Sequence, residues 1–137
     1  MKRYLAILLV GFLFLGLVSM HSCKTAETWS PLGLWTINFL IPSWSHDWTD
    51  TVTFSGNDDG GSVYGLTCAT MCAPQTGTWT KTGDYSITMT FDFYWGSFHE
   101  VINLTGTSSE ANPNIMTGSG SWVEDGSSAN MTFSASR

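Results

Sequence analysis

Positive charge is the scarcest property of this 137-residue sequence. Five Lys and Arg residues stand against 11 Asp and Glu residues, and charged residues of all kinds make up only 12% of the chain. Proteins that bind nucleic acids depend on Lys and Arg side chains at the phosphates. The composition therefore argues against nucleic acid as a partner.

Motifs for common catalytic and nucleotide-binding chemistry are also missing. The sequence contains no G-x-S-x-G, no H-E-x-x-H and no phosphate-binding glycine loop. His99 precedes Glu100, but neighbours on a strand point to opposite faces, so these two cannot easily act together. The acidic stretch 57–59 fits a hairpin turn better than a calcium loop, because no full ligand set follows it. We expect no enzyme activity, no cofactor and no metal site.

Cysteine is scarce, and its odd number is informative. The chain has three cysteines, which are Cys23, Cys68 and Cys72. In an exported protein an odd count leaves one thiol to be explained. Two basic residues at positions 2–3 precede an uncharged apolar run over 4–18, which is the order of a secretory signal peptide. The run is short for a membrane span, although an uncleaved N-terminal anchor is the alternative interpretation.

The end of this segment resembles a bacterial lipoprotein signal. Ser22 is the small residue before a cysteine, Cys23, that would be lipidated and become the new N-terminus. The resemblance implies removal of residues 1–22 and several acyl chains on Cys23, palmitate among them, which together hold a protein firmly on a membrane. Residues 23–30 would form a short tether. Lys24 follows the lipidated residue, which implies the outer membrane if the cell is Gram-negative.

Cleavage would leave a small, acidic domain over residues 31–137. Loss of the basic residues at 2–3 leaves Lys24, Lys81 and Arg137 against 11 acidic residues, a net charge of −8. All seven tryptophans lie after the signal. The remaining length is enough for one domain with a real core.

Cys68 and Cys72 form an even pair in an oxidising compartment. Their spacing is not the C-x-x-C of a redox motif, and a metal would need two further ligands with no histidine nearby in the sequence. We predict a disulfide between them. Its ring is small, so it would stabilise the fold by only about 2 kcal/mol and would mainly stiffen one loop.

Apolar and polar residues alternate along the domain and are interrupted by turn residues. The clearest stretch is DYSITMTFDFYW, in which Ile87, Met89 and Phe91 face one way. The predicted strands cover 33–41, 48–56, 62–67, 77–82, 84–95, 98–108, 114–123 and 129–137. No segment has a convincing helical period.

Eight sequential strands with short links predict an all-β fold, an antiparallel up-and-down β-barrel, since closure removes exposed sheet edges. A sandwich of two sheets is the alternative. The interior of an eight-stranded barrel is just filled by side chains or holds one small ligand. The bulky inward residues favour a small cavity or none.

Gly33-Leu34-Trp35 opens the first strand, and Arg137 ends the last. This combination resembles the lipocalin and fatty-acid-binding (calycin) superfamily, in which a G-x-W tryptophan packs near a basic residue of the terminal strand. The resemblance implies a lipocalin-like barrel. It also implies that Trp35 and Arg137 plug the closed end by a cation–π contact, which is a structural role.

The candidate ligand-binding residues gather at one end of such a barrel. In an up-and-down barrel the first, third, fifth and seventh connections between strands lie at the same end. The third of these is the loop that holds Cys68 and Cys72. These connections carry Trp44, His46, Trp48, Trp95, Phe98 and His99. Loops on a rigid scaffold usually carry function, and exposed aromatic residues usually cover or bind something. The alternative is a hydrophobic lid that includes Trp48 and Phe98.

Two functions follow from this pattern. The first is a membrane-anchored, lipocalin-like binding protein in the bacterial cell envelope, monomeric, with a small apolar or amphipathic ligand at the open end. The second is a filled barrel that docks on or inhibits another envelope protein, such as a hydrolase. A ligand carrier needs a cavity of a few hundred Å³, whereas a docking protein needs none.

Overall fold

The computed structural model describes residues 28–137, which fold into eight strands and one short 3-10 turn. The elements are β1 (Gly33–Ile41), η1 (Pro42–Trp44), β2 (His46–Gly56), β3 (Gly60–Leu66), β4 (Gln75–Gly83), β5 (Ser86–Trp95), β6 (Phe98–Thr107), β7 (Ile115–Glu124) and β8 (Ser127–Ser136). The predicted signal segment and Cys23 lie outside the described residues. Within residues 28–137 no helix is long and apolar enough to cross a membrane.

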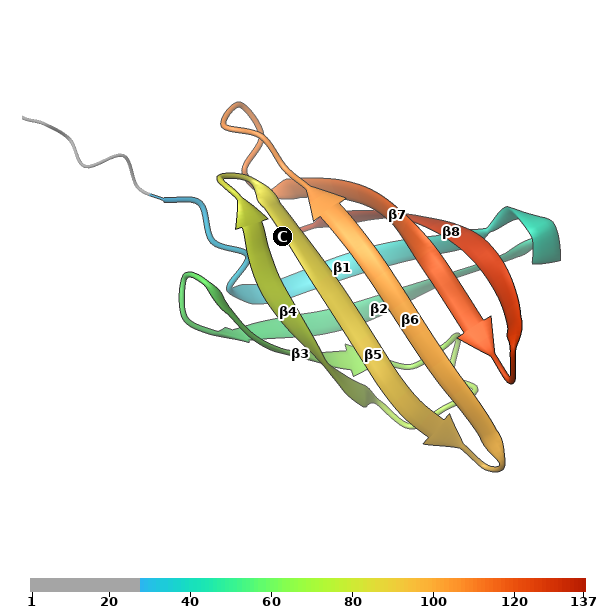
Figure 1. Ribbon diagram of the computed structural model, residues 1–137. Coiled ribbons are helices and arrows are strands. Elements are labelled where there is room, and N and C mark those ends of the chain that lie inside the picture. Colours follow the sequence, from blue (N-terminus) through green and yellow to red (C-terminus); the bar gives the residue numbers. More distant parts are fainter. Residues whose placement is uncertain (1–27) are drawn as a thin grey trace, which may run out of the picture.

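Each strand pairs antiparallel with its neighbour in the sequence, and β8 pairs with β1 to close the sheet (Figure 1). The predicted all-β, eight-stranded up-and-down barrel is therefore confirmed, and the two-sheet sandwich is excluded. The strand bounds follow the predicted ranges with small shifts. β2 begins at His46 because η1 is a tight turn, in which Ser45 N donates to Pro42 O (3.2 Å) from a left-handed conformation (φ 50°).

Strict alternation along the strands fills the interior of the barrel. On β1 every second residue from Trp35 to Ile41 is buried, and on β5 the same holds from Ile87 to Phe93. The largest fully buried side chains include Trp35, Trp79, Trp122, Phe54 and Phe91. Burying each such side chain stabilises the fold by about 1.5–3 kcal/mol.

Glycine makes room for some of this bulk. A Cβ atom at Gly118 on β7 would lie 2.4 Å from Cε1 of Phe133 on the neighbouring β8. A side chain larger than hydrogen at position 118 would therefore displace the Phe133 ring. The aromatic rings occupy the barrel so fully that the small residues opposite them are part of the packing.

One end of the barrel, at the odd-numbered connections, is incompletely closed by strands; we call this end the mouth. β2 pairs with β3 only over Thr53–Gly56, and β4 pairs with β5 only as far as Thr78 opposite Thr90. The mouth-side parts of β2 and β5 therefore have no partner in β3 or β4. The segment 67–74 lies in this gap and contains both cysteines of the domain (Figure 1).

The opposite, closed end is plugged by Trp35 and Arg137. The Trp35 indole Nε1 donates to Pro31 O (2.6 Å), and the Arg137 guanidinium lies 4.8 Å from the Trp35 ring centroid. Arg137 Nη1 also donates to Ser30 O (3.1 Å) and Leu32 O (2.9 Å). The contact expected from the sequence is thus present, and it ties the last residue of the chain to the start of β1.

The chain segment before β1 also belongs to this plug. Trp29 is only 6% exposed, and its Nε1 donates to Pro113 O (2.8 Å). Its carbonyl accepts a bond from Lys81 Nζ (2.9 Å), and its ring centroid lies 6.1 Å from that of Tyr85. The packed domain therefore begins before the predicted boundary at residue 31, and residues 28–30 of the predicted tether lie on the barrel.

Replacing Trp35 with Ala is expected to lower the free energy of unfolding by about 3–5 kcal/mol, because it removes a fully buried indole and a hydrogen bond. Chemical denaturation would measure the loss. Leu34→Ala is the matched control, since Leu34 precedes Trp35 on β1 but its side chain is exposed. Equal midpoints for the two variants would contradict the assigned role of Trp35.

Candidate functional site

Four aromatic side chains pack together at the mouth, and we call them the mouth cluster: Trp44, His46, Trp48 and Trp122. The Trp122 ring centroid lies 5.9 Å from that of Trp44 and 5.4 Å from that of Trp48, both in edge-to-face geometry. His46 lies 5.2 Å from Trp48. The strands β2 and β7 supply three members, while the turn η1 folds Trp44 back toward Trp122.

Asp50 holds the base of this cluster in place. It is a buried carboxylate on β2, and its Oδ2 accepts bonds from Trp48 Nε1 (2.9 Å) and from Thr67 N (2.9 Å). Thr67 Oγ1 donates to the other oxygen. Both carboxylate oxygens are therefore satisfied. Asp50 fixes the Trp48 indole and fastens segment 67–74 to β2, which is a positioning role.

Other buried polar atoms near the mouth have no partner. Among residues 28–137 three such side-chain atoms are found, namely His46 Nε2, Glu100 Oε2 and Trp122 Nε1. A buried polar atom without a hydrogen bond costs about 1–3 kcal/mol. Native structures keep few of these, and each calls for an explanation such as a water or a ligand.

Two of the unpartnered atoms belong to residues that line one hollow. This hollow has a volume of about 280 Å³ and is lined by Trp44, His46, Met71, Trp122 and Glu124. The volume lies just below the usual range for small-molecule sites, which begins at about 300 Å³. The interior below it is filled with side chains, so the hollow has room for one small molecule beside Trp44, His46 and Trp122.

Glu100 lies behind this hollow. It is 3% exposed, and on the β6–β7 ladder it stands directly opposite Glu124, which lines the hollow. Burial raises the pKa of Glu100 above its ordinary value, and the nearby carboxylates of Glu124 and Asp125 raise it further. The basic side chains of the described chain, Lys81 and Arg137, bond to groups at the closed end instead. The mouth is therefore an acidic, aromatic site.

The loop over 67–74 forms one wall of the mouth, and its backbone is strained. Cys68, Ala69 and Thr70 are consecutive residues with positive φ values of 50°, 59° and 70°. For non-glycine residues this conformation costs roughly 1–2 kcal/mol each. The turn presents Met71 to the hollow. Such strain persists only where surrounding contacts hold it, and it clusters at functional sites.

Both cysteines of this loop are free, buried thiols, in contrast to the disulfide expected from the sequence. Burial raises the pKa of the Cys68 thiol, and the adjacent Cys72 side chain raises it further. Burial also raises the pKa of Cys72. Only a thiolate attacks another sulfur, so in the folded barrel both groups are poorly reactive. Formation of the disulfide stays a prediction.

The sequence-predicted ligand residues fall into three groups. Trp44, His46 and Trp48 come together in the mouth cluster. Trp95 and Phe98 instead pair with each other at the tip of the β5–β6 hairpin, with ring centroids 6.0 Å apart. Neither lines the hollow.

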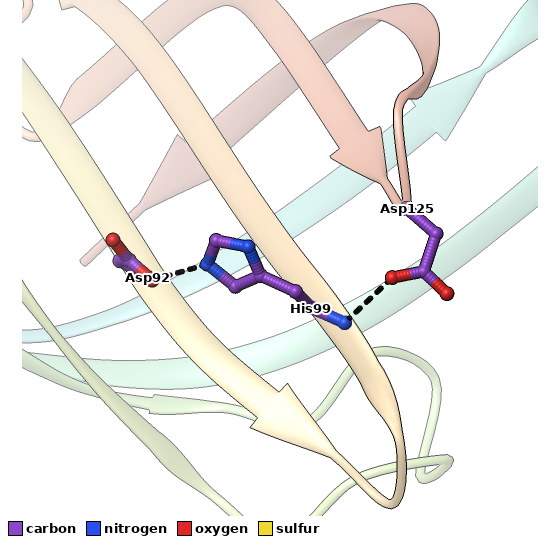
Figure 2. Close-up of polar contacts among 3 residues, drawn as sticks. All are labelled: Asp92, His99 and Asp125. Carbon is purple, nitrogen blue, oxygen red and sulfur yellow. Dashed lines mark hydrogen bonds and ion pairs between the residues drawn. The ribbon is translucent and has the colours of Figure 1, made fainter.

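His99 lies on the outer face of β6 and belongs to a separate set of contacts. Figure 2 shows its ring beside Asp92, with Nε2 2.8 Å from Oδ1, and its backbone N donating to Asp125 Oδ1 (3.1 Å). The ring also stacks on Tyr94 at 4.6 Å. Because these neighbours hold the imidazole on the outside, His99 and the inward Glu100 point apart, as the alternation predicts.

Five contributors to the mouth are missing from the sequence-predicted site: Asp50, Met71, Glu100, Trp122 and Glu124. A signal for two of them exists. Glu100 shares the inward face of its strand with Ile102 and Leu104, and an acidic residue in such a row is out of place. Trp122 likewise shares the face of Met116.

No three His, Cys, Asp or Glu side chains within residues 28–137 are grouped so that they could hold a metal ion. Comparison of the chain with protein-family models, with curated proteins and with solved structures finds no match.

Replacing Glu100 with Gln is expected to stabilise the barrel at neutral pH. Its folded-state pKa lies above the ordinary value of 4.5, so ionisation of the carboxyl opposes folding. This cost is absent below 4.5, where the group is protonated in both states, and grows as the pH rises through the folded-state pKa. The melting temperature of Glu100→Gln should be several degrees higher than that of the parent at pH 7 and close to it at pH 4.

The matched control is Glu110→Gln, which makes the same chemical change at an exposed position near the closed end. The melting temperature of Glu110→Gln should differ little from that of the parent at both pH values. An unchanged or lower melting temperature for Glu100→Gln at pH 7 would show that the buried carboxylate is not a cost to the fold.

Proposed function

We propose that this protein is a membrane-anchored, lipocalin-like barrel that binds one small amphipathic ligand at its mouth. The observation that carries the proposal is the pair of unpartnered atoms, Trp122 Nε1 and His46 Nε2, on residues that line an aromatic hollow of about 280 Å³. A ligand with an apolar body and a polar group satisfies both the rings and these atoms. The bulk of the barrel interior restricts it to the mouth.

The anchor proposed at Cys23 fits this location of the site. The described chain begins at the closed end, where Trp29 and Arg137 pack. A lipid on Cys23, a few residues earlier, would hold that end toward the bacterial membrane. The mouth, at the other end of the strands, would then face away from the membrane, where a dissolved ligand can reach it.

Acylation of Cys23 is tested directly by mass spectrometry of the protein extracted from membranes. We expect an N-terminal Cys23 carrying acyl chains, because residues 1–22 have the order of a lipoprotein signal. A mature protein that still begins at Met1 would contradict both cleavage and lipidation.

Ligand binding is expected to change tryptophan emission, because a ligand in the hollow desolvates the exposed ring of Trp44 and lies beside the buried Trp122. Full-length protein in non-ionic detergent would be titrated with small water-soluble alcohols, amines and acids. Trp44→Ala should weaken binding by about tenfold or more, since it removes a wall of the hollow and leaves the buried core intact.

Trp95→Ala is the matched control for this experiment. Trp44 and Trp95 are the same residue type with nearly equal exposure, 43% and 41%, but only Trp44 lines the hollow. Equal weakening by both variants would move the site to the hairpin tip. Absence of any saturable change across the panel would reject the ligand-binding function.

A second candidate is docking on an envelope protein, such as a hydrolase. The observation that favours it is the exposed aromatic group at the β5–β6 hairpin, where Tyr94, Trp95 and Phe98 remain accessible. Stacking holds two of these rings together, so the surface is already ordered. If a cell-wall hydrolase were inhibited by the parent but not by Trp95→Ala, this candidate would replace ligand binding.

A further inference from the structure

The charge of the mouth restricts the kind of ligand that fits it. Glu124 lines the hollow, the buried Glu100 stands opposite it on the next strand, and Asp125 follows in the β7–β8 turn. No Lys or Arg side chain of residues 28–137 balances these groups, because Lys81 and Arg137 bond at the closed end. A carboxylate head group, such as that of a fatty acid, would be repelled, whereas a positive head group would be attracted.

The aromatic lining favours the same sign of charge. Trp44 and Trp122 line the hollow with their rings in edge-to-face contact, and His46 adds a third ring. A cation near the face of an indole is attracted by its π electrons, and tryptophan is the strongest such partner among the side chains. Rings and carboxylates together form the usual surroundings of a bound ammonium group.

The unpartnered atoms require a ligand that also has a hydrogen-bond acceptor. Trp122 is 2% exposed, and its indole N–H can only donate. An ammonium group also only donates, so it can bond to a carboxylate but not to Trp122. An acceptor close to the ammonium, such as a hydroxyl group, would satisfy the indole. His46 Nε2 can meet either partner, because its role depends on the tautomer.

The size of the hollow sets the last limit. About 280 Å³ above a filled core accommodates one aromatic ring with a two-carbon chain but no long acyl chain. We infer that the mouth binds a small aromatic amino alcohol, with its ammonium group at Glu124, in front of the buried Glu100, and its hydroxyl accepting from Trp122. This inference rests on the proposed ligand-binding function and names its ligand class.

Three probes that differ only in one group test the inference by calorimetric titration of the full-length protein at pH 7.5. They are 2-amino-1-phenylethanol, 1-phenylethane-1,2-diol and 2-hydroxy-2-phenylacetate, which share the ring and the hydroxyl but end in a cation, a neutral group and an anion. We expect the cation to bind at least about tenfold more tightly than the diol, and the anion to show no saturable heat.

Variants identify the group that recognises the charge. Glu124→Gln should reduce the affinity for the cation to that of the diol and leave the affinity for the diol unchanged. Glu124 is only partly buried, so this variant is expected to fold, which melting curves would verify. Glu110→Gln removes the same charge at the closed end and should change neither affinity.

The outcomes separate the two proposals. If none of the three probes binds but another compound of the broader panel saturates and depends on Trp44, the aromatic amino alcohol is rejected while ligand binding at the mouth stands. If nothing in either set binds, both proposals are rejected. If the diol or the anion binds as tightly as the cation, the mouth is a ligand site but its preference for ammonium is wrong. If Glu124→Gln binds the cation as tightly as the parent, recognition by the mouth carboxylates is overturned.

Discussion

Closing eight strands into a barrel leaves an interior that side chains just fill, and this constraint governs the rest of the molecule. Here much of the filling is aromatic: Trp35, Phe54 and Trp79 pack edge-to-face in sequence, and Phe91 is fully buried as well. A barrel filled in this way gains its stability from burial and has no deep cavity to offer. Any chemistry must therefore take place where the filling stops, at one of the two ends.

The interior filling is closed off differently at the two ends of the barrel. At the closed end, the Trp35 indole, the Arg137 guanidinium and the Lys81 ammonium all find backbone carbonyls of residues 29–32. At the mouth, β3 and β4 are too short to complete the sheet, and a strained loop takes their place. Locally unfavourable features gather there, including a buried carboxylate with a raised pKa and an indole without an acceptor. Natural proteins accept such violations mainly at functional sites.

Much of this architecture could be predicted from the sequence, because alternation with a period of two determines which residues face inward. The eight strands follow from that pattern. The contact between Trp35 and Arg137 is expected instead from the resemblance of Gly33-Leu34-Trp35 and Arg137 to the lipocalin superfamily. Alternation does not reveal how far a strand remains paired. The turn η1 brings Trp44 to Trp122 on β7, while Trp95 stays with Phe98 at a hairpin tip. The paired length of a strand depends on contacts between distant segments, which the alternation does not encode. The sequence pattern therefore assigned all of the aromatic residues at the mouth end to one site.

Two histidines near the same end show why hydrogen bonding, rather than residue type, distinguishes the site from its surroundings. His99 bonds to Asp92 and stacks on Tyr94, so its ring already has partners on the outer face. His46 packs against Trp48, but its Nε2 is buried without a partner. A ligand that reached His99 would have to replace existing bonds. A ligand at His46 would form bonds that the free protein lacks, so part of its binding free energy would come from relieving a cost already present in the fold. The same reasoning applies to Trp122, and it supports the ligand site that we propose at the mouth.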